Sequence, residues 1–203
     1  MLKSKESQAI RQPGGKEQKS VYRGCFFCKS GKENDVVRHF KVVFPEEKAI
    51  APTRTRYRRT RDTAIEEQVP LLPGYVFFEI REEGTQAPEI LDEILIALQS
   101  FSHTDSVLKL LKYTDGDWRL RGFDNQFAEM LLKMDGNIGV SQAYFDEGKR
   151  IRILDGFLKD YEGSIVRVNK KARTVEVGLD FQGKKVSMWL GYELVAPVED
   201  GDA

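Results

Sequence analysis

Short apolar runs typical of strands alternate with helical periodicity along the first two thirds of the chain. Residues 21–28 predict a strand with aromatic and cysteine side chains on both faces, and therefore a central place in a sheet. Apolar side chains over 36–44 follow the spacing of one helical face, and Pro45 ends that helix. Ser30 and Glu33 stand three residues apart, which predicts a capping box at the start of the helix.

The same alternation continues further along the chain. Residues 48–61 favour an extended, solvated strand because threonine and arginine alternate there, and 74–80 and 107–111 form two more apolar strands. Helical periodicity predicts two further helices, over 88–101 and 123–134. The order β-α-β-β-α-β-α predicts an α+β unit in which a small antiparallel or mixed sheet is joined to helices.

Helical periodicity then stops, and short runs with β-branched residues follow, separated by turns. The expected strands cover 150–154, 164–169, 174–179, 186–190 and 192–195. Five short strands in about fifty residues predict a small β-barrel. The β-branched positions disfavour helix, so we expect this barrel to be permanent.

Two domains with polar ends follow from this pattern. We expect a disordered tail at 1–20, a first domain at 21–135, a linker at 136–146, a barrel domain at 147–197 and an acidic tail at 198–203.

Composition narrows the class of protein. The chain of 203 residues is 40% hydrophobic and has no run of 18 apolar residues and no apolar signal-peptide core, so we expect a cytoplasmic protein without membrane association. Basic and acidic residues balance at 32 each, yet six basic residues and no acidic one fall between positions 48 and 61. This local charge indicates a polyanionic partner.

Enzymatic chemistry finds little support. His39 and His103 lie in no catalytic motif, and no phosphate loop or nucleophile elbow is present, so we expect no enzyme and no cofactor. Cys25 and Cys28 have too few companions for a zinc site, and positions three apart on a strand point to opposite faces. We interpret both as buried apolar side chains, with a thiol or zinc role as the alternative.

Two short segments carry a family resemblance. Residues 151–166 resemble a KOW motif. They read as a strand, a glycine turn, an aromatic residue, a second glycine and a second strand. Residues 72–75 (LPGY), directly before an apolar strand, resemble the hallmark of the NusG N-terminal domain. Their order and separation are specific, and the resemblance covers roughly residues 21–197.

The resemblance implies an α+β fold: a NusG N-terminal (NGN) domain with a four-stranded sheet flanked by helices, followed by an SH3-like β-barrel KOW domain. It further implies a non-enzymatic transcription elongation factor that binds RNA polymerase near upstream or non-template DNA. The KOW domain in this family recruits a further partner. We expect a monomer.

The resemblance also assigns candidate sites. The polymerase-binding residues are Leu72, Pro73, Gly74 and Tyr75. An exposed apolar patch with a tyrosine anchor suits an interface, and the alternative is that Leu71 and Leu72 close the core. The candidate nucleic-acid-binding residues of the first domain are Arg54, Arg56, Arg58, Arg59 and Arg61, with Tyr57 available to stack. Those of the barrel are Arg167, Lys170, Lys171 and Arg173, which suit a nascent RNA, with a solvated turn as the alternative.

Two departures from the usual family pattern point to a specialised paralogue. Phe157 stands where the family usually has proline, and Gln182 stands where it usually has an aromatic residue. These departures put partnership with Rho or a ribosomal protein in doubt. The chain is most similar to the LoaP group, which implies processive antitermination. A general NusG-type elongation factor and a KOW-containing ribosome-associated RNA-binding protein remain the alternatives.

Overall fold

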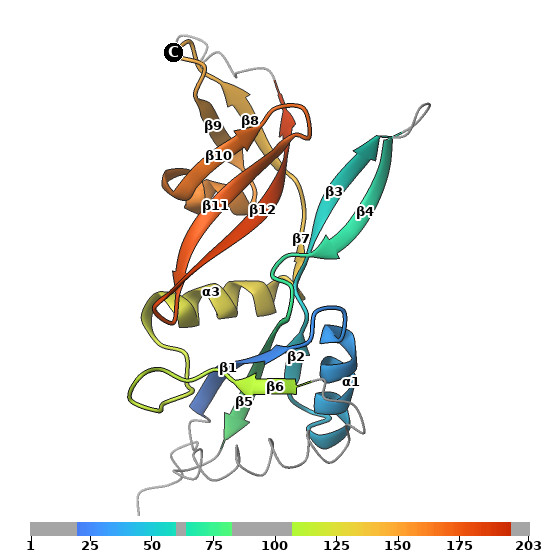
Figure 1. Ribbon diagram of the computed structural model, residues 1–203, viewed down its shortest axis with the longest axis vertical. Coiled ribbons are helices and arrows are strands. Elements are labelled where there is room, and N and C mark those ends of the chain that lie inside the picture. The colour runs from blue at the N-terminus through green and yellow to red at the C-terminus, as the bar shows by residue number, and fades with distance from the viewer. Residues whose placement is uncertain (1–19, 60–63, 83–106, 196–203) are drawn as a thin grey trace, which may run out of the picture.

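The computed structural model describes residues 20–59, 64–82 and 107–195. An antiparallel four-stranded sheet lies at one end of the molecule, with the strand order β2-β5-β1-β6 (Figure 1). Its strands are β1 (Ser20–Cys28), β2 (Lys48–Ile50), β5 (Tyr75–Glu82) and β6 (Val107–Leu110). The expected central position of the 21–28 strand is confirmed, because β1 is hydrogen-bonded to β5 on one side and β6 on the other.

Two helices cover opposite faces of this sheet. Helix α1 (Glu33–Val43) buries Val36 and Phe40 in one apolar cluster together with Phe26 of β1. Helix α3 (Gly122–Lys133) buries its apolar residues in a second cluster that contains Cys25 and Phe77. Side chains alternate across a strand, so neighbouring residues of β1 supply both clusters.

A long hairpin extends from the sheet. It consists of β3 (Thr53–Arg59) and β4 (Ala64–Pro70), which pair antiparallel, and β3 also pairs in parallel with the short strand β7 (Asn137–Ile138). Sequence patterning did not predict β4, because Glu66, Glu67 and Gln68 have low strand propensity. Cross-strand pairing stabilises β4 despite this low propensity, because Glu67 lies directly opposite Arg56.

The last third of the described chain is a curled five-stranded sheet with the order β10-β11-β12-β8-β9. Its elements are β8 (Ser141–Phe145), β9 (Ile151–Asp155), the 3₁₀ segment η1 (Phe157–Ser164), β10 (Ile165–Asn169), β11 (Thr174–Phe181) and β12 (Lys184–Leu194). The segment expected as a linker, 136–146, therefore contributes β7 and β8. Strands predicted separately at 186–190 and 192–195 form one strand, because Gly191 is extended and does not break it.

Helix α3 lies between the four-stranded sheet and the curled sheet (Figure 1). Its Phe127 meets Phe77 of the sheet below, with ring centroids 5.9 Å apart. The same ring meets Tyr161 of η1 and Phe181 of β11, at 6.3 and 6.2 Å. One apolar core thus runs from the first sheet through α3 into the curled sheet.

The predicted capping box is wrong. Helix α1 begins at Glu33 after Lys32, and no side chain caps its first turn. The Glu33 carboxylate instead accepts a hydrogen bond from the backbone N–H of Gly74, at 2.7 Å. This distant partner satisfies a buried amide and removes Glu33 from local capping.

The helix expected over 88–101 and most of both tails lie outside the described residues. Across the described ranges, no helix is long and apolar enough to cross a membrane.

Candidate functional site

The turn before β5 holds Gly74 in a backbone conformation suited to glycine. Its φ is +86°, and a Cβ added there would lie 2.9 Å from the carbonyl oxygen of Cys28. The Cys28 N–H donates to the Gly74 carbonyl at 2.8 Å, and the Gly74 N–H donates to Glu33. The Tyr75 N–H closes the turn by donating to the Leu72 carbonyl at 3.1 Å. The turn is therefore rigidly tied to β1 and α1.

The four predicted polymerase-binding residues differ in exposure. Leu72 and Gly74 are buried, Pro73 is exposed and Tyr75 is partly buried. Leu71 and Leu72 both belong to the apolar core. Of the aromatic and aliphatic side chains in this turn, Tyr75 is thus the one available as an interface anchor.

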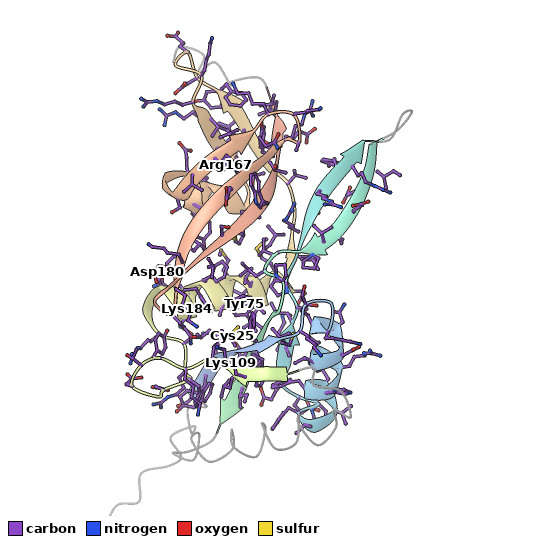
Figure 2. All side chains as sticks on the ribbon, viewed as in Figure 1. Cys25, Tyr75, Lys109, Arg167, Asp180 and Lys184 are labelled. Atoms are coloured by element: carbon purple, nitrogen blue, oxygen red, sulfur yellow. The ribbon has the colours of Figure 1, made fainter. Side chains whose placement is uncertain are left out.

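Tyr75 lies beneath the tip of the β11–β12 hairpin. Its ring makes edge contacts with Phe27 at 5.3 Å and with Phe181 at 6.1 Å between centroids. Lys184, which follows that tip, lines one cavity together with Tyr75 (both labelled in Figure 2). Burial raises the pKa of the Tyr75 hydroxyl. A cavity of about 320 Å³ remains beside the ring, between β6 and the hairpin tip.

Polar contacts fix the hairpin tip in place. The backbone N–H of Gln182 donates to Oδ2 of Asp124 at 3.1 Å, and the Tyr113 hydroxyl donates to the same oxygen at 2.6 Å. The pKa of Tyr113 is raised to about 12, mainly by burial and to a lesser degree by this hydrogen bond to Asp124. Gln182, one of the two departures from the family pattern, therefore faces the first sheet unit in this arrangement.

Three arginines of β3 lie on one face of the hairpin. Arg54, Arg56 and Arg58 alternate along the strand and so point to the same side. Glu67 of β4 pairs with two of them: with Arg56 at 2.8 Å and with Arg58 at 2.6 Å. The charge count along the sequence missed this carboxylate, because it lies across the hairpin. The Arg59 side chain and Arg61 lie outside the described residues.

Arg54 differs from its neighbours. It is half-buried, and its Nη1 atom is buried without a hydrogen-bond partner among the described residues. Burial, together with the charge of Arg56, lowers its pKa. A buried guanidinium nitrogen without a partner is costly unless an anion comes to it.

The basic residues of the curled sheet do not form one cluster. Arg167 lies 3.7 Å from Glu176, and the Lys170 ammonium sits 4.3 Å above the Phe145 ring. Lys171 and Arg173 instead line a cavity of about 800 Å³ whose opposite wall is β3. The structure therefore divides this set of four into two pairs.

The same cavity is lined by Trp189 and Tyr192, which the sequence analysis did not single out. Both lie on β12, and they share the cavity with β3 because segments far apart in the sequence approach each other in the fold. No local motif signals such a meeting.

The two cysteines lie on opposite faces of β1, as the strand period predicts, and both are free. Burial raises the pKa of both thiols, that of Cys28 to about 11. Among the described residues, no three His, Cys, Asp or Glu side chains gather to hold a metal ion. His39 lies on α1 and His103 outside the described residues.

Comparison with known proteins adds little to this picture. No protein-family model matches the chain, and no curated protein matches it. Among solved structures, the chain is similar to NusG of Thermotoga maritima, from a structural study of domain interaction in that protein. The similarity covers 85% of this chain and 94% of that one, with 15% sequence identity and a TM-score of 0.41. Values this low do not by themselves establish a common fold.

Proposed function

We propose that this protein is a specialised NusG-type transcription factor, similar to the LoaP group, that binds RNA polymerase and promotes processive antitermination. Within the expected set of Leu72, Pro73, Gly74 and Tyr75, the polymerase-binding surface comprises Pro73 and Tyr75, with Tyr75 as the anchor. Leu72 and Gly74 are buried and hold the turn in place. The protein acts as a cytoplasmic monomer without catalysis or a cofactor. It works by coupling two movable parts of the polymerase and so shifting the population toward the elongating state.

The observation that carries the proposal is the geometry of the turn at Gly74. Hydrogen bonds from the Gly74 backbone to the Cys28 backbone and to the Glu33 carboxylate hold this turn, and the next residue is a partly buried tyrosine. A fixed aromatic side chain suits an interface centre, because little conformational entropy is lost when it binds. Phe181 covers part of Tyr75, so polymerase contact requires the hairpin tip to move away.

The basic surfaces supply the nucleic-acid contacts of the proposal. In this proposal, the β3 arginines contact upstream or non-template DNA, and the basic residues of the curled sheet contact nascent RNA. Arginine suits this role because its planar fork binds phosphate oxygens in pairs. Their contribution should weaken as salt rises.

Two alternatives remain. A general elongation factor would use the same Tyr75 surface without a recruiting RNA. A ribosome-associated RNA-binding protein would need the curled sheet but not the Tyr75 surface.

A single-round transcription assay across an intrinsic terminator separates these functions. One template carries the native upstream leader and a second carries a scrambled leader. Read-through that rises with the native leader alone supports the antiterminator. Equal effects on both templates favour a general elongation factor, and no effect without polymerase binding favours the ribosome-associated protein.

A further inference from the structure

The cavity between β3 and the curled sheet unites residues from both predicted nucleic-acid-binding sets. Its basic side chains come from two walls: Arg54, Arg56 and Arg58 from β3, and Lys171 and Arg173 from the turn between β10 and β11. One acidic residue, Glu193, also lines it, and Glu67 neutralises part of the β3 wall. The lining remains net positive, as a phosphate-binding groove requires.

Aromatic side chains stand among these charges. Tyr57 is exposed, Trp189 is partly exposed, and both line the cavity. Basic side chains interleaved with accessible aromatic rings are the arrangement that binds a single strand, because the backbone follows the charges and unpaired bases stack on the rings. A duplex keeps its bases stacked on one another and offers such rings nothing to bind.

Two polar groups in the lining have no partner among the described residues. The Nη1 atom of Arg54 is one, and the hydroxyl of Tyr192 is the other. Tyr192 is 1% exposed, so water does not compensate its hydroxyl in the way that it would at the surface. Both groups are donors, and a shift of their side chains toward the cavity would let a phosphate or base oxygen accept from them.

The two walls meet at one close contact. A Cβ on Gly191 of β12 would lie 3.1 Å from the Thr55 carbonyl oxygen of β3 and 2.8 Å from Val140. Glycine at this position therefore lets the strands approach, and it holds the walls at a fixed separation. A volume of about 800 Å³ accommodates a small segment of a flexible chain and is far too small for a duplex.

We propose that this cavity is a composite groove for single-stranded nucleic acid, built by β3 on one wall and by Lys171, Arg173 and Trp189 on the other. The inference deepens the proposed function and rests on it, because it turns two separate nucleic-acid surfaces into one site. Phosphates bind Arg54 and the two basic side chains opposite it, and bases stack on Tyr57 and Trp189.

The test measures binding of unstructured oligouridylate and oligothymidylate, each of about eight nucleotides, to the full chain without polymerase. Replacing Lys171 and Arg173 together with glutamine should weaken binding at least about tenfold and lower the slope of log affinity against log salt by about 1.4. The matched control replaces Lys149 and Arg150 with glutamine, because it removes two exposed charges from the turn between β8 and β9, outside the groove and outside both candidate nucleic-acid-binding sets. That control should retain most of the affinity.

The opposite wall is tested with Arg54→Gln and Tyr57→Ala. Tyr57→Ala should weaken oligonucleotide binding about five- to hundredfold, which is the range for the loss of one stacked base. Trp189 reports occupancy directly: its fluorescence should be quenched by the oligonucleotide, and Trp189→Phe should abolish the quenching, since Trp118 is buried elsewhere.

Binding of either oligonucleotide that these substitutions weaken as stated supports the groove. Comparison of oligouridylate with oligothymidylate then shows whether the groove prefers RNA or DNA. Equal losses in the groove variant and its control would overturn it. Tighter binding of a base-paired hairpin would overturn it too, as would equal competition by polyglutamate. Because polymerase is absent from the assay, failure of the groove leaves the proposed polymerase binding separately testable.

Discussion

Phe181→Ala should release the hairpin tip from the first sheet unit. Phe181 is 2% exposed and makes edge contacts with Tyr75, Phe77 and Phe127 at centroid distances of 6.1, 5.6 and 6.2 Å. Truncation of a buried phenylalanine costs about 3–5 kcal/mol. At 1.4 kcal/mol for each factor of ten, the closed arrangement should lose about 100- to 4,000-fold in population.

Hydrogen exchange of the Gln182 amide measures this opening, because that amide donates to Asp124 across the contact. The amide should exchange about 100- to 4,000-fold faster in the Phe181→Ala variant. The control is Phe145→Ala, which removes an aromatic ring that contacts Tyr192 within the curled sheet. Gln182 exchange that stays unchanged in the Phe181 variant, or rises equally in the control, would refute the reasoning.

Three further predictions concern the turn and the thiols. Gly74→Ala should destabilise the protein by at least about 2 kcal/mol in urea unfolding, through the left-handed backbone and the Cys28 carbonyl. Gly31→Ala has the same sign of φ and open space around it, so it should cost only the backbone part, about 1–2 kcal/mol. Glu33→Ala should cost about 1–3 kcal/mol, because it leaves the Gly74 N–H buried without an acceptor. With a pKa of about 11, Cys28 should react slowly with a thiol reagent at pH 8, and its contribution to stability should be complete below about pH 8.5 and fall as pH rises toward 11. Fast reaction at pH 8 in the folded protein would contradict the burial of this thiol.

Elements whose apolar residues repeat with the period of a strand or of a helix were predictable from the sequence. The strand over 21–28 and helix α1 have clear apolar patterns, and each buries the side that its pattern indicates. Burial of both cysteines on opposite faces of β1 follows from the period of two. In these segments local pattern and tertiary packing agree.

Features created by contacts across the fold could not be predicted from the sequence. Strand β4 forms because Glu67 pairs with arginines on β3, which outweighs its low propensity. Glu33 matches a capping box in sequence, yet the nearest buried donor belongs to Gly74. Trp189 joins the candidate site only because the β12 backbone approaches β3 at Gly191.

The packing of Phe181 also depends on contacts across the fold and could not be predicted from the sequence. Phe181 directly precedes Gln182, whose departure from the family pattern puts partnership with Rho or a ribosomal protein in doubt, and its ring packs on the aromatic side chains beside Tyr75. Nothing in the local sequence distinguishes an aromatic residue that faces a partner from one that packs on its own chain. The distinction depends on where α3 and β5 present complementary rings.

Polymerase affinity of three proteins tests the central claim most directly: wild type, Phe181→Ala and the double variant Phe181→Ala/Tyr75→Ala. Removing the Phe181 ring from Tyr75 raises the fraction of molecules whose Tyr75 is free to contact polymerase. The Phe181 variant should therefore bind immobilised core RNA polymerase more tightly than wild type. The double variant should bind at least about tenfold more weakly than the Phe181 variant, since the anchor is then absent. Equal affinity of the single and double variants would contradict the claim that Tyr75 anchors this protein on polymerase.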